Sequence, residues 1–189
     1  MYDRYKQPSL FVSVMAILFF ILLTPGCSTR HLQSMNTLSI QVDETLESFE
    51  RTIIGGDTFL EKSEGVLVFP SVIKAGVGFG GEYGEGILRV EGRTADYYST
   101  AGASFGFQFG AQRKSIVFVF LDKAALWSFQ HSDGWKAGVD GSITIADWGI
   151  GEDINTIEIH SPVVAFAFDD EGFMYNLTLE GTKFTRLRH

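Results

Sequence analysis

Two glycine-rich stretches of the sequence match patterns that bind cofactors or catalyse hydrolysis in other proteins. The first, GVGFGG at residues 76–81, fits GxGxxG, in which the N-terminal amides of a following helix hold the pyrophosphate of a dinucleotide. The next residues, EYGEG at 82–86, are too rich in glycine for a helix and carry two carboxylates that would repel phosphate. The sequence therefore predicts no nucleotide site here.

The second stretch, GASFG at residues 102–106, fits GxSxG and would make Ser104 a nucleophile. Asp147 or Asp153 and then His160 follow in the order of a hydrolase triad. However, such a nucleophile stands on a sharp turn from strand to helix. Here apolar and small residues alternate on both sides, which predicts that Ser104 lies in the middle of a strand. A serine esterase that uses Ser104 is kept as a remote alternative.

Metal-binding patterns are equally weak. The four histidines are scattered without the spacing of a zinc site. The run Asp169-Asp170-Glu171 lacks the pattern of a calcium loop and is better explained as a turn. We therefore predict no catalytic residue, no metal and no cofactor, and we do not expect an enzyme.

The N-terminus has the layout of a secretory signal. A weakly basic start is followed by an apolar run at residues 10–23, which is short for a membrane-spanning helix. The only cysteine, Cys27, comes just after it, where bacterial lipoproteins carry the residue that is modified with lipid. Gly26 fits that pattern and Pro25 does not, so an uncleaved anchor and an ordinary signal peptide stay open as alternatives.

We expect residues 1–26 to be a signal peptide and Cys27 to carry the lipid, with palmitate among its acyl chains. Residues 27–33 would form a short tether ahead of a single domain at 34–189. Ser28 resembles the residue that follows the cysteine in lipoproteins sent to the outer membrane. The expected location is the bacterial envelope, as an outer-membrane lipoprotein that faces the periplasm.

The rest of the chain predicts an α+β fold of mainly antiparallel strands, sandwich-like or barrel-like, with an N-terminal amphipathic helix and a short inserted helix. Apolar residues spaced three and four apart from Met35 to Ile53 mark the amphipathic helix, whose outer face is acidic. Thr58 and Glu61 fit a capping box for a second short helix, and Asp122 fits the cap of the inserted one. Strands are expected at residues 66–69, 86–90, 94–99, 99–112, 116–121, 135–146, 162–168, 173–179 and 183–187, and the wholly apolar 116–121 should be covered on both faces.

The charge of the chain excludes one class of partner. There are 15 basic and 23 acidic residues, and residues 1–26 hold two of the basic and one of the acidic ones, which leaves 13 and 22, a net of −9. Because nucleic acid is bound by basic patches, we expect no nucleic acid partner. Purely electrostatic attachment to anionic lipid is not expected either.

Glycines alternate with β-forming residues between Gly65 and Gln112, which removes side chains from one face of the strands. Such a face allows another backbone to approach closely or forms a groove, and packing is the default explanation. Nearby aromatic residues, Tyr83 and Phe105 among them, would line a slot for acyl chains or belong to the core.

The same stretch carries a family resemblance. The chain resembles the SYLF domain family over about residues 37–187. The resemblance is carried by VLVFPSVIKAGVGFGGEYGEG, DYYSTAGASFGFQFGAQ, the Gly134-Trp135 strand and NLTLEGTKFTRL. The resemblance implies a lipid-binding domain without catalysis, and eukaryotic members bind phosphoinositides and in some cases actin. Phosphoinositide binding there is associated with a basic N-terminal helix, which is acidic here. Actin is not expected as the partner of an envelope protein.

The resemblance therefore implies a membrane phospholipid as the partner. Lys74 in the VIKAG segment is the first candidate for a headgroup contact, because cationic donors favour phosphate. The further candidates are Arg93, Arg113, Lys114, Tyr83 and Phe105. The alternative is a structural or protein-interaction module of the envelope that has no lipid ligand and whose protein partner is unknown.

Overall fold

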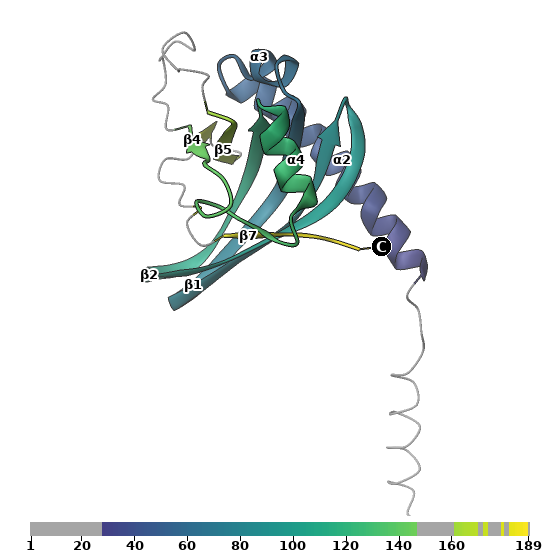
Figure 1. The fold of residues 1–189 in the computed structure, drawn as a ribbon. Helices are drawn as coiled ribbons and strands as arrows, with labels where there is room; N and C mark the ends of the chain where they lie inside the picture. Colours follow the sequence, from purple (N-terminus) through teal and green to yellow (C-terminus); the bar gives the residue numbers. More distant parts are fainter. Residues whose placement is uncertain (1–27, 147–160, 170–171, 174–178, 180–181, 189) are drawn as a thin grey trace, which may run out of the picture. The chain divides into compact units, whose positions relative to one another are not determined.

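A computed structural model describes residues 28–146, 161–169, 172–173, 179 and 182–188. The chain divides into two compact units, Met1–Asn36 and Thr37–His189, and the fold described below is that of the second (Figure 1). Within the described residues it is a seven-stranded, mostly antiparallel sheet that curls into a half-barrel and carries a few helices. The fold is α+β and dominated by strands, as the sequence predicts. None of the described helices has both the length and the apolar character needed to span a bilayer.

One long hairpin forms most of the sheet. β1 (Gly65–Val90) and β2 (Arg93–Phe120) pair antiparallel along nearly their whole length. Glu91 and Gly92 form the turn with φ values of 50° and 72°, the two positive angles that a tight hairpin turn requires. The predicted hairpin is confirmed. β1 and β2 also include segments that the sequence predicts as separate strands. At Pro70, for example, the chain forms a bulge and β1 continues beyond it.

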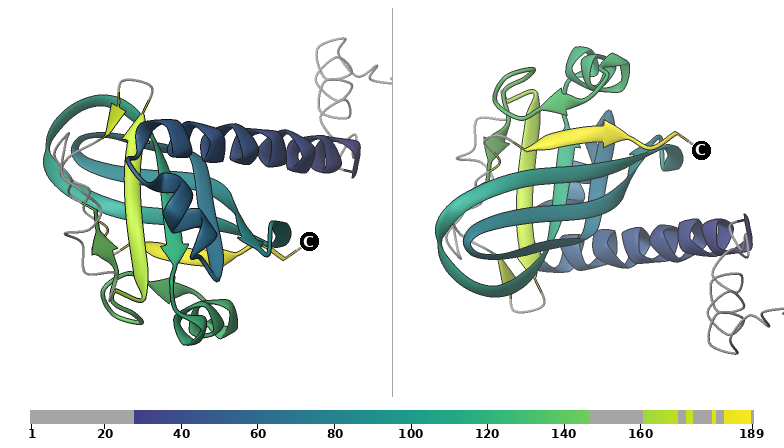
Figure 2. Two further views of the ribbon diagram at one scale, coloured as in Figure 1. Left: turned by 90° about the horizontal axis from the view of Figure 1, so that it is seen from above. Right: turned by 90° about the horizontal axis from the view of Figure 1, so that it is seen from below.

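The hairpin folds back over itself instead of lying flat (Figure 2). Bulges interrupt the pairing of β1 at several places, the first of them beside Pro70, and bulges bend a strand. Further along β1, Gly84 and Gly86 lie directly against the beginning of the same strand. A Cβ atom on Gly84 would come within 2.9 Å of the Ser71 carbonyl oxygen, and one on Gly86 would collide with the Val68 carbonyl oxygen. The two glycines therefore permit a close approach of backbone to backbone.

The other strands extend the sheet from the second edge of β2. β7 (Lys183–Arg186) pairs with residues 98–101 of β2 and β5 (Val163–Asp169) with residues 115–120, both antiparallel. Three strands of two residues complete the described sheet: β3 (Trp135–Lys136) beside β7, and β4 (Thr144–Ile145) and β6 (Gly172–Phe173) beside β5. Of these described pairings, that of β4 with β5 is parallel.

The prediction of one strand over residues 135–146 is wrong. β3 ends at Lys136, whose backbone N–H donates a hydrogen bond to the Asp140 carboxylate at 2.7 Å. Gly138 lies in the same turn with a φ of 78°. An Asp side chain that bonds the backbone and a glycine with positive φ both favour a turn, so the chain reverses here and begins β4 only at Thr144.

Helices cover both faces of the sheet where β2 pairs with β5. On one face α2 (Ser28–Thr52) buries Phe49, which meets Phe166 edge-on with 4.9 Å between the ring centroids. On the other face α4 (Lys123–His131) buries Phe129, which packs against Phe120 at 5.1 Å. Residues 116–120 are all buried, so the predicted covering of this strand on both faces is confirmed.

The two short helices begin in different ways. α3 (Gly56–Glu61) starts after Gly55, which has a φ of 73° and offers no side chain as a cap. The helix therefore begins two residues before Thr58, and the predicted capping box is wrong. α4 starts after Asp122, whose carboxylate accepts a hydrogen bond from the Ala125 N–H at 2.8 Å, which confirms the predicted cap.

Candidate functional site

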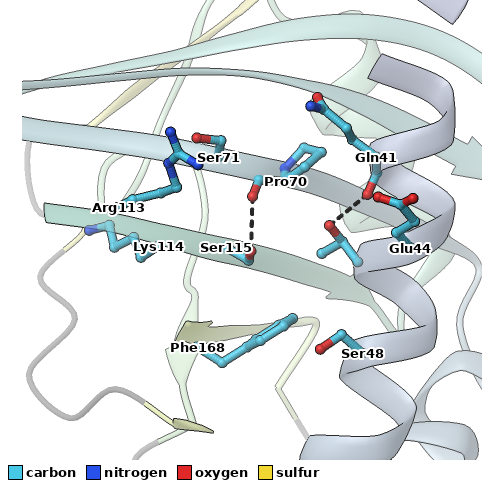
Figure 3. Close-up of a pocket in the computed structure, with 10 residues that line it drawn as sticks. Gln41, Glu44, Ser48, Pro70, Ser71, Arg113, Lys114, Ser115 and Phe168 are labelled. Carbon is cyan, nitrogen blue, oxygen red and sulfur yellow. Dashed lines mark hydrogen bonds between the residues drawn. The ribbon is translucent and has the colours of Figure 1, made fainter. Parts of the chain in front are cut away.

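A pocket of about 280 Å³ opens between α2 and the first bulge of β1 (Figure 3). β2 forms one wall, α2 forms the opposite wall, and a side chain of β5 lies at one end. Most of the lining is polar. The lining residues are Gln41, Glu44, Thr45 and Ser48 of α2, Pro70 and Ser71 of β1, Arg113, Lys114 and Ser115 of β2, and Phe168 of β5.

The bulge shapes one side of this pocket. Two residues of β1, Pro70 and Ser71, stand opposite the single residue Ser115 of β2. The Ser115 hydroxyl donates a hydrogen bond to the Pro70 carbonyl oxygen at 2.9 Å and so satisfies an acceptor that the interrupted ladder leaves over. On the opposite wall the Thr45 hydroxyl donates to the Gln41 carbonyl oxygen at 2.7 Å. Both walls therefore present hydroxyl oxygens to the pocket.

Arg113 supplies a positive charge that no group among the described residues neutralises. Its side chain is exposed, and within the described residues it forms no hydrogen bond and no ion pair. Glu44 on α2 is exposed too and has no ion-pair partner in the same part of the chain. Figure 3 shows these two side chains on opposite walls. The pocket thus holds one available cation and one available anion.

The ammonium group of Lys114, the next residue after Arg113, forms an ion pair with Glu82. Successive residues of a strand point to opposite faces, so Arg113 and Ser115 share the face of α2 while Lys114 points to the other. There the Lys114 ammonium donates to the Glu82 carboxylate at 3.1 Å, and the Thr182 hydroxyl donates to the same carboxylate at 3.2 Å. The side chains of Lys114 and Glu82 are only 10% and 7% exposed. The charge of Lys114 is therefore held in an internal ion pair.

The other residues predicted as lipid contacts are dispersed. Lys74 is half-buried on β1 and does not line the pocket. Arg93 is the exposed first residue of β2, at the turn end of the hairpin. Phe105 lies within β2, but the surroundings of its side chain fall outside what the structure describes, as does Cys27. Among the predicted contacts, Arg113 is the one that brings a free charge to the pocket.

Tyr83 is 52% exposed on β1, and its hydroxyl donates a hydrogen bond to the Glu85 carboxylate at 2.8 Å. Partial burial of the hydroxyl, this hydrogen bond and the negative charge of Glu85 together raise the pKa of Tyr83 from 10.0 to about 12. Because the folded state holds the proton more tightly than the unfolded chain does, this group stabilises the fold fully below pH 10. That contribution is lost as the pH rises from 10 to about 12.

We expect a spectrophotometric titration of the native chain to show one tyrosine that ionises near pH 12, identified by its absence from Tyr83→Phe. Glu85→Gln removes the negative charge, so the transition should shift toward pH 10 without reaching it, because burial remains. A native Tyr83 transition at pH 10 would contradict this assignment.

Both catalytic-looking motifs lie inside strands. Residues 76–81 belong to β1, and Ser104 lies within β2 opposite Gly80. Neither position has the strand-to-helix turn that its motif requires. The remaining residues of the hydrolase pattern, Asp147, Asp153 and His160, lie outside the described residues. Across the part of the chain that the structure describes, no group of three or more His, Cys, Asp or Glu residues could hold a metal ion.

The glycine-rich face is filled by protein at the positions where its surroundings are described. Gly84 and Gly86 lie against the beginning of β1. A Cβ atom on Gly102 would lie 3.1 Å from Glu82 and 3.3 Å from the Thr182 hydroxyl oxygen. At these positions glycine serves close packing, and the polar pocket lies elsewhere, beside α2.

The hydroxyl groups of the pocket were not predicted from the sequence. Ser48, Ser71 and Ser115 come from α2, β1 and β2 and are distant from one another along the chain. The one sequence signal was Pro70, because a proline in an apolar strand indicates a bulge or an edge. The register of the hairpin determines which residues face that bulge, and a local sequence pattern does not reveal this register.

The folded-back hairpin, the curled antiparallel sheet and the helices on its two faces define a β-dominated α+β domain, and a polar pocket lies beside α2. A family model described as Ysc84, the Las17-binding protein actin regulator, matches residues 101–188. This match agrees with the resemblance of the sequence to the SYLF domain family. The family is not in general one of enzymes. A search of curated proteins found no match.

Proposed function

We propose that this chain is a non-enzymatic domain that binds the headgroup of a membrane phospholipid in the pocket beside α2. The observation that carries the proposal is the free guanidinium of Arg113, which lines a pocket rich in hydroxyl groups. A guanidinium group matches the geometry of phosphate and can donate two parallel hydrogen bonds to it. The match of residues 101–188 to the SYLF family supports the same function, because the family resemblance implies lipid binding.

The size and the lining of the pocket favour a headgroup over an acyl chain. Its volume of about 280 Å³ lies just below the range of typical ligand sites, which span roughly 300–1,000 Å³. Its walls are mostly polar, whereas an acyl chain gains free energy only against apolar walls. The acyl chains would therefore remain in the membrane while the protein binds the group at the surface.

Attachment to the membrane is the second part of the proposal. Cys27, just after the apolar run, would carry the lipid and hold the domain on the periplasmic side of the bacterial outer membrane. An anchored domain meets headgroups at high local concentration. It therefore needs no positive net charge, which agrees with the acidic composition of the chain.

Arg113→Ala is expected to lower the affinity for phospholipid about tenfold or more. A hydrogen bond to a charged group contributes about 1.5–3 kcal/mol, and about 1.4 kcal/mol corresponds to a factor of ten. The full-length chain in detergent micelles would be titrated with short-chain phospholipids, with native mass spectrometry as the readout. Arg51→Ala is the matched control, since it removes an exposed arginine of α2 that does not line the pocket, and its affinity should be unchanged.

Two results would contradict the proposal. One is a purified chain that neither carries phospholipid nor binds any that is added. The other is an Arg113→Ala variant that binds as the native chain does. The first result would favour the structural or protein-interaction module, and the second would move the lipid site away from this pocket.

A further inference from the structure

The charges of the pocket suggest more than a phosphate site. Arg113 lies on the β2 wall and Glu44 on the α2 wall, and in the described residues they pair neither with each other nor with another group (Figure 3). The neighbouring Asp43, by contrast, forms an ion pair with Arg89 at 2.7 Å. Because opposite charges on facing walls are held apart, the pocket is complementary to a ligand that carries one charge of each sign.

The groups between the two charged walls are small and form hydrogen bonds. The hydroxyls of Ser48 and Ser71 have no partner within the described residues and can accept or donate. The Ser115 hydroxyl already donates to a backbone carbonyl, so it presents lone pairs. Phe168 is only 2% exposed and offers little aromatic surface to a ligand. This lining suits a cation that donates hydrogen bonds and does not suit one that needs an aromatic cage.

We infer that the pocket binds a phosphate ester of ethanolamine, with the phosphate on Arg113 and the primary ammonium on Glu44. The ammonium has three N–H donors, which the Glu44 carboxylate and the serine hydroxyls can accept together. The inference rests on the proposed function and names its headgroup. In a membrane this ligand is phosphatidylethanolamine, and the same chemistry exists in the soluble compound glycerophosphoethanolamine.

Other common headgroups match the pocket less well. Phosphocholine has no N–H to donate to Glu44, and phosphoglycerol leaves the charge of that carboxylate uncompensated. A headgroup with several phosphates brings more negative charge than Arg113 alone balances, because the ammonium of Lys114 is already paired with Glu82. Glu44 would repel the additional phosphates.

The test compares short-chain phosphatidylethanolamine, phosphatidylcholine and phosphatidylglycerol on the full-length chain in detergent micelles. We expect the ethanolamine lipid to bind about tenfold more tightly than either of the others, the range of one charge-assisted hydrogen bond. Glu44→Gln should abolish the preference over phosphatidylglycerol. Glu47→Gln removes an exposed carboxylate of the same helix that does not line the pocket, so this control should keep the preference.

The possible outcomes separate this inference from the proposed function. Equal affinities for the three lipids, or a preference that survives Glu44→Gln, would overturn the ethanolamine assignment while phospholipid binding stands. No binding of any lipid would overturn both, unless glycerophosphoethanolamine binds with the same Glu44 dependence. In that case the ligand chemistry is upheld, and the ligand is the soluble compound instead of a membrane lipid.

Discussion

Gly86→Ala is expected to destabilise the protein by about 3 kcal/mol or more, a large part of the roughly 5–15 kcal/mol that stabilises a typical domain. A Cβ atom at this position would overlap the Val68 carbonyl oxygen and lie 2.6 Å from Cδ1 of Phe69. Neither neighbour can move easily, because Val68 is paired with β2 and Phe69 is fully buried. The free energy of unfolding, measured by urea denaturation with circular dichroism, would give the size of the effect.

Gly81→Ala is the matched control on the same strand. The nearest atom to its Cβ would be the Gly102 carbonyl oxygen at 3.8 Å, an ordinary contact. This variant should therefore range from neutral to about 1 kcal/mol more stable, since alanine reduces the entropy of the unfolded chain. If both variants had the stability of the native chain, the two parts of β1 would not be in contact.

The glycines of β1 show which part of the fold can be predicted from the sequence. The alternating glycines are visible in the sequence, and close packing is the explanation that the sequence favours for them. The apparent nucleotide and esterase motifs arise from the same alternation, because glycine at every second position inevitably produces GxG patterns. The sequence does not show that Gly86 meets Val68, because this contact requires the strand to fold back on itself.

The features predicted correctly share a local cause. The amphipathic helix follows from spacing within 20 residues, the hairpin turn from Glu91-Gly92, and the start of α4 from the side chain of Asp122. The features that failed depend on distant contacts. Nothing local in residues 135–146 shows that β3 pairs with β7 while β4 pairs with β5. Likewise, only the register places Arg113 on the face of α2 and Lys114 on the other.

Removing one partner of the internal ion pair between Glu82 and Lys114 should have the other large effect. Glu82→Gln leaves the ammonium of Lys114 almost fully buried without a counter-charge, and Lys114→Met does the same to the carboxylate. Loss of one partner of a buried pair costs about 3–5 kcal/mol, because the remaining charge cannot return to water without opening the fold. The ion pair joins β1 to β2, and Glu82 also accepts a hydrogen bond from Thr182, the residue that precedes β7. Urea unfolding of either variant should therefore show the loss of stability.

The double variant separates the value of the pair from the cost of an orphaned charge. With Glu82→Gln and Lys114→Met together no charge remains to be buried, and the side-chain amide that replaces the carboxylate can still accept the hydrogen bond from Thr182. Its stability should lie within about 1 kcal/mol of the native chain, far from the sum of the two single losses. Additive losses would instead mean that each side chain acts through its own packing. Single variants that cost less than about 1 kcal/mol would show that water reaches both groups and that this part of the curled sheet opens readily.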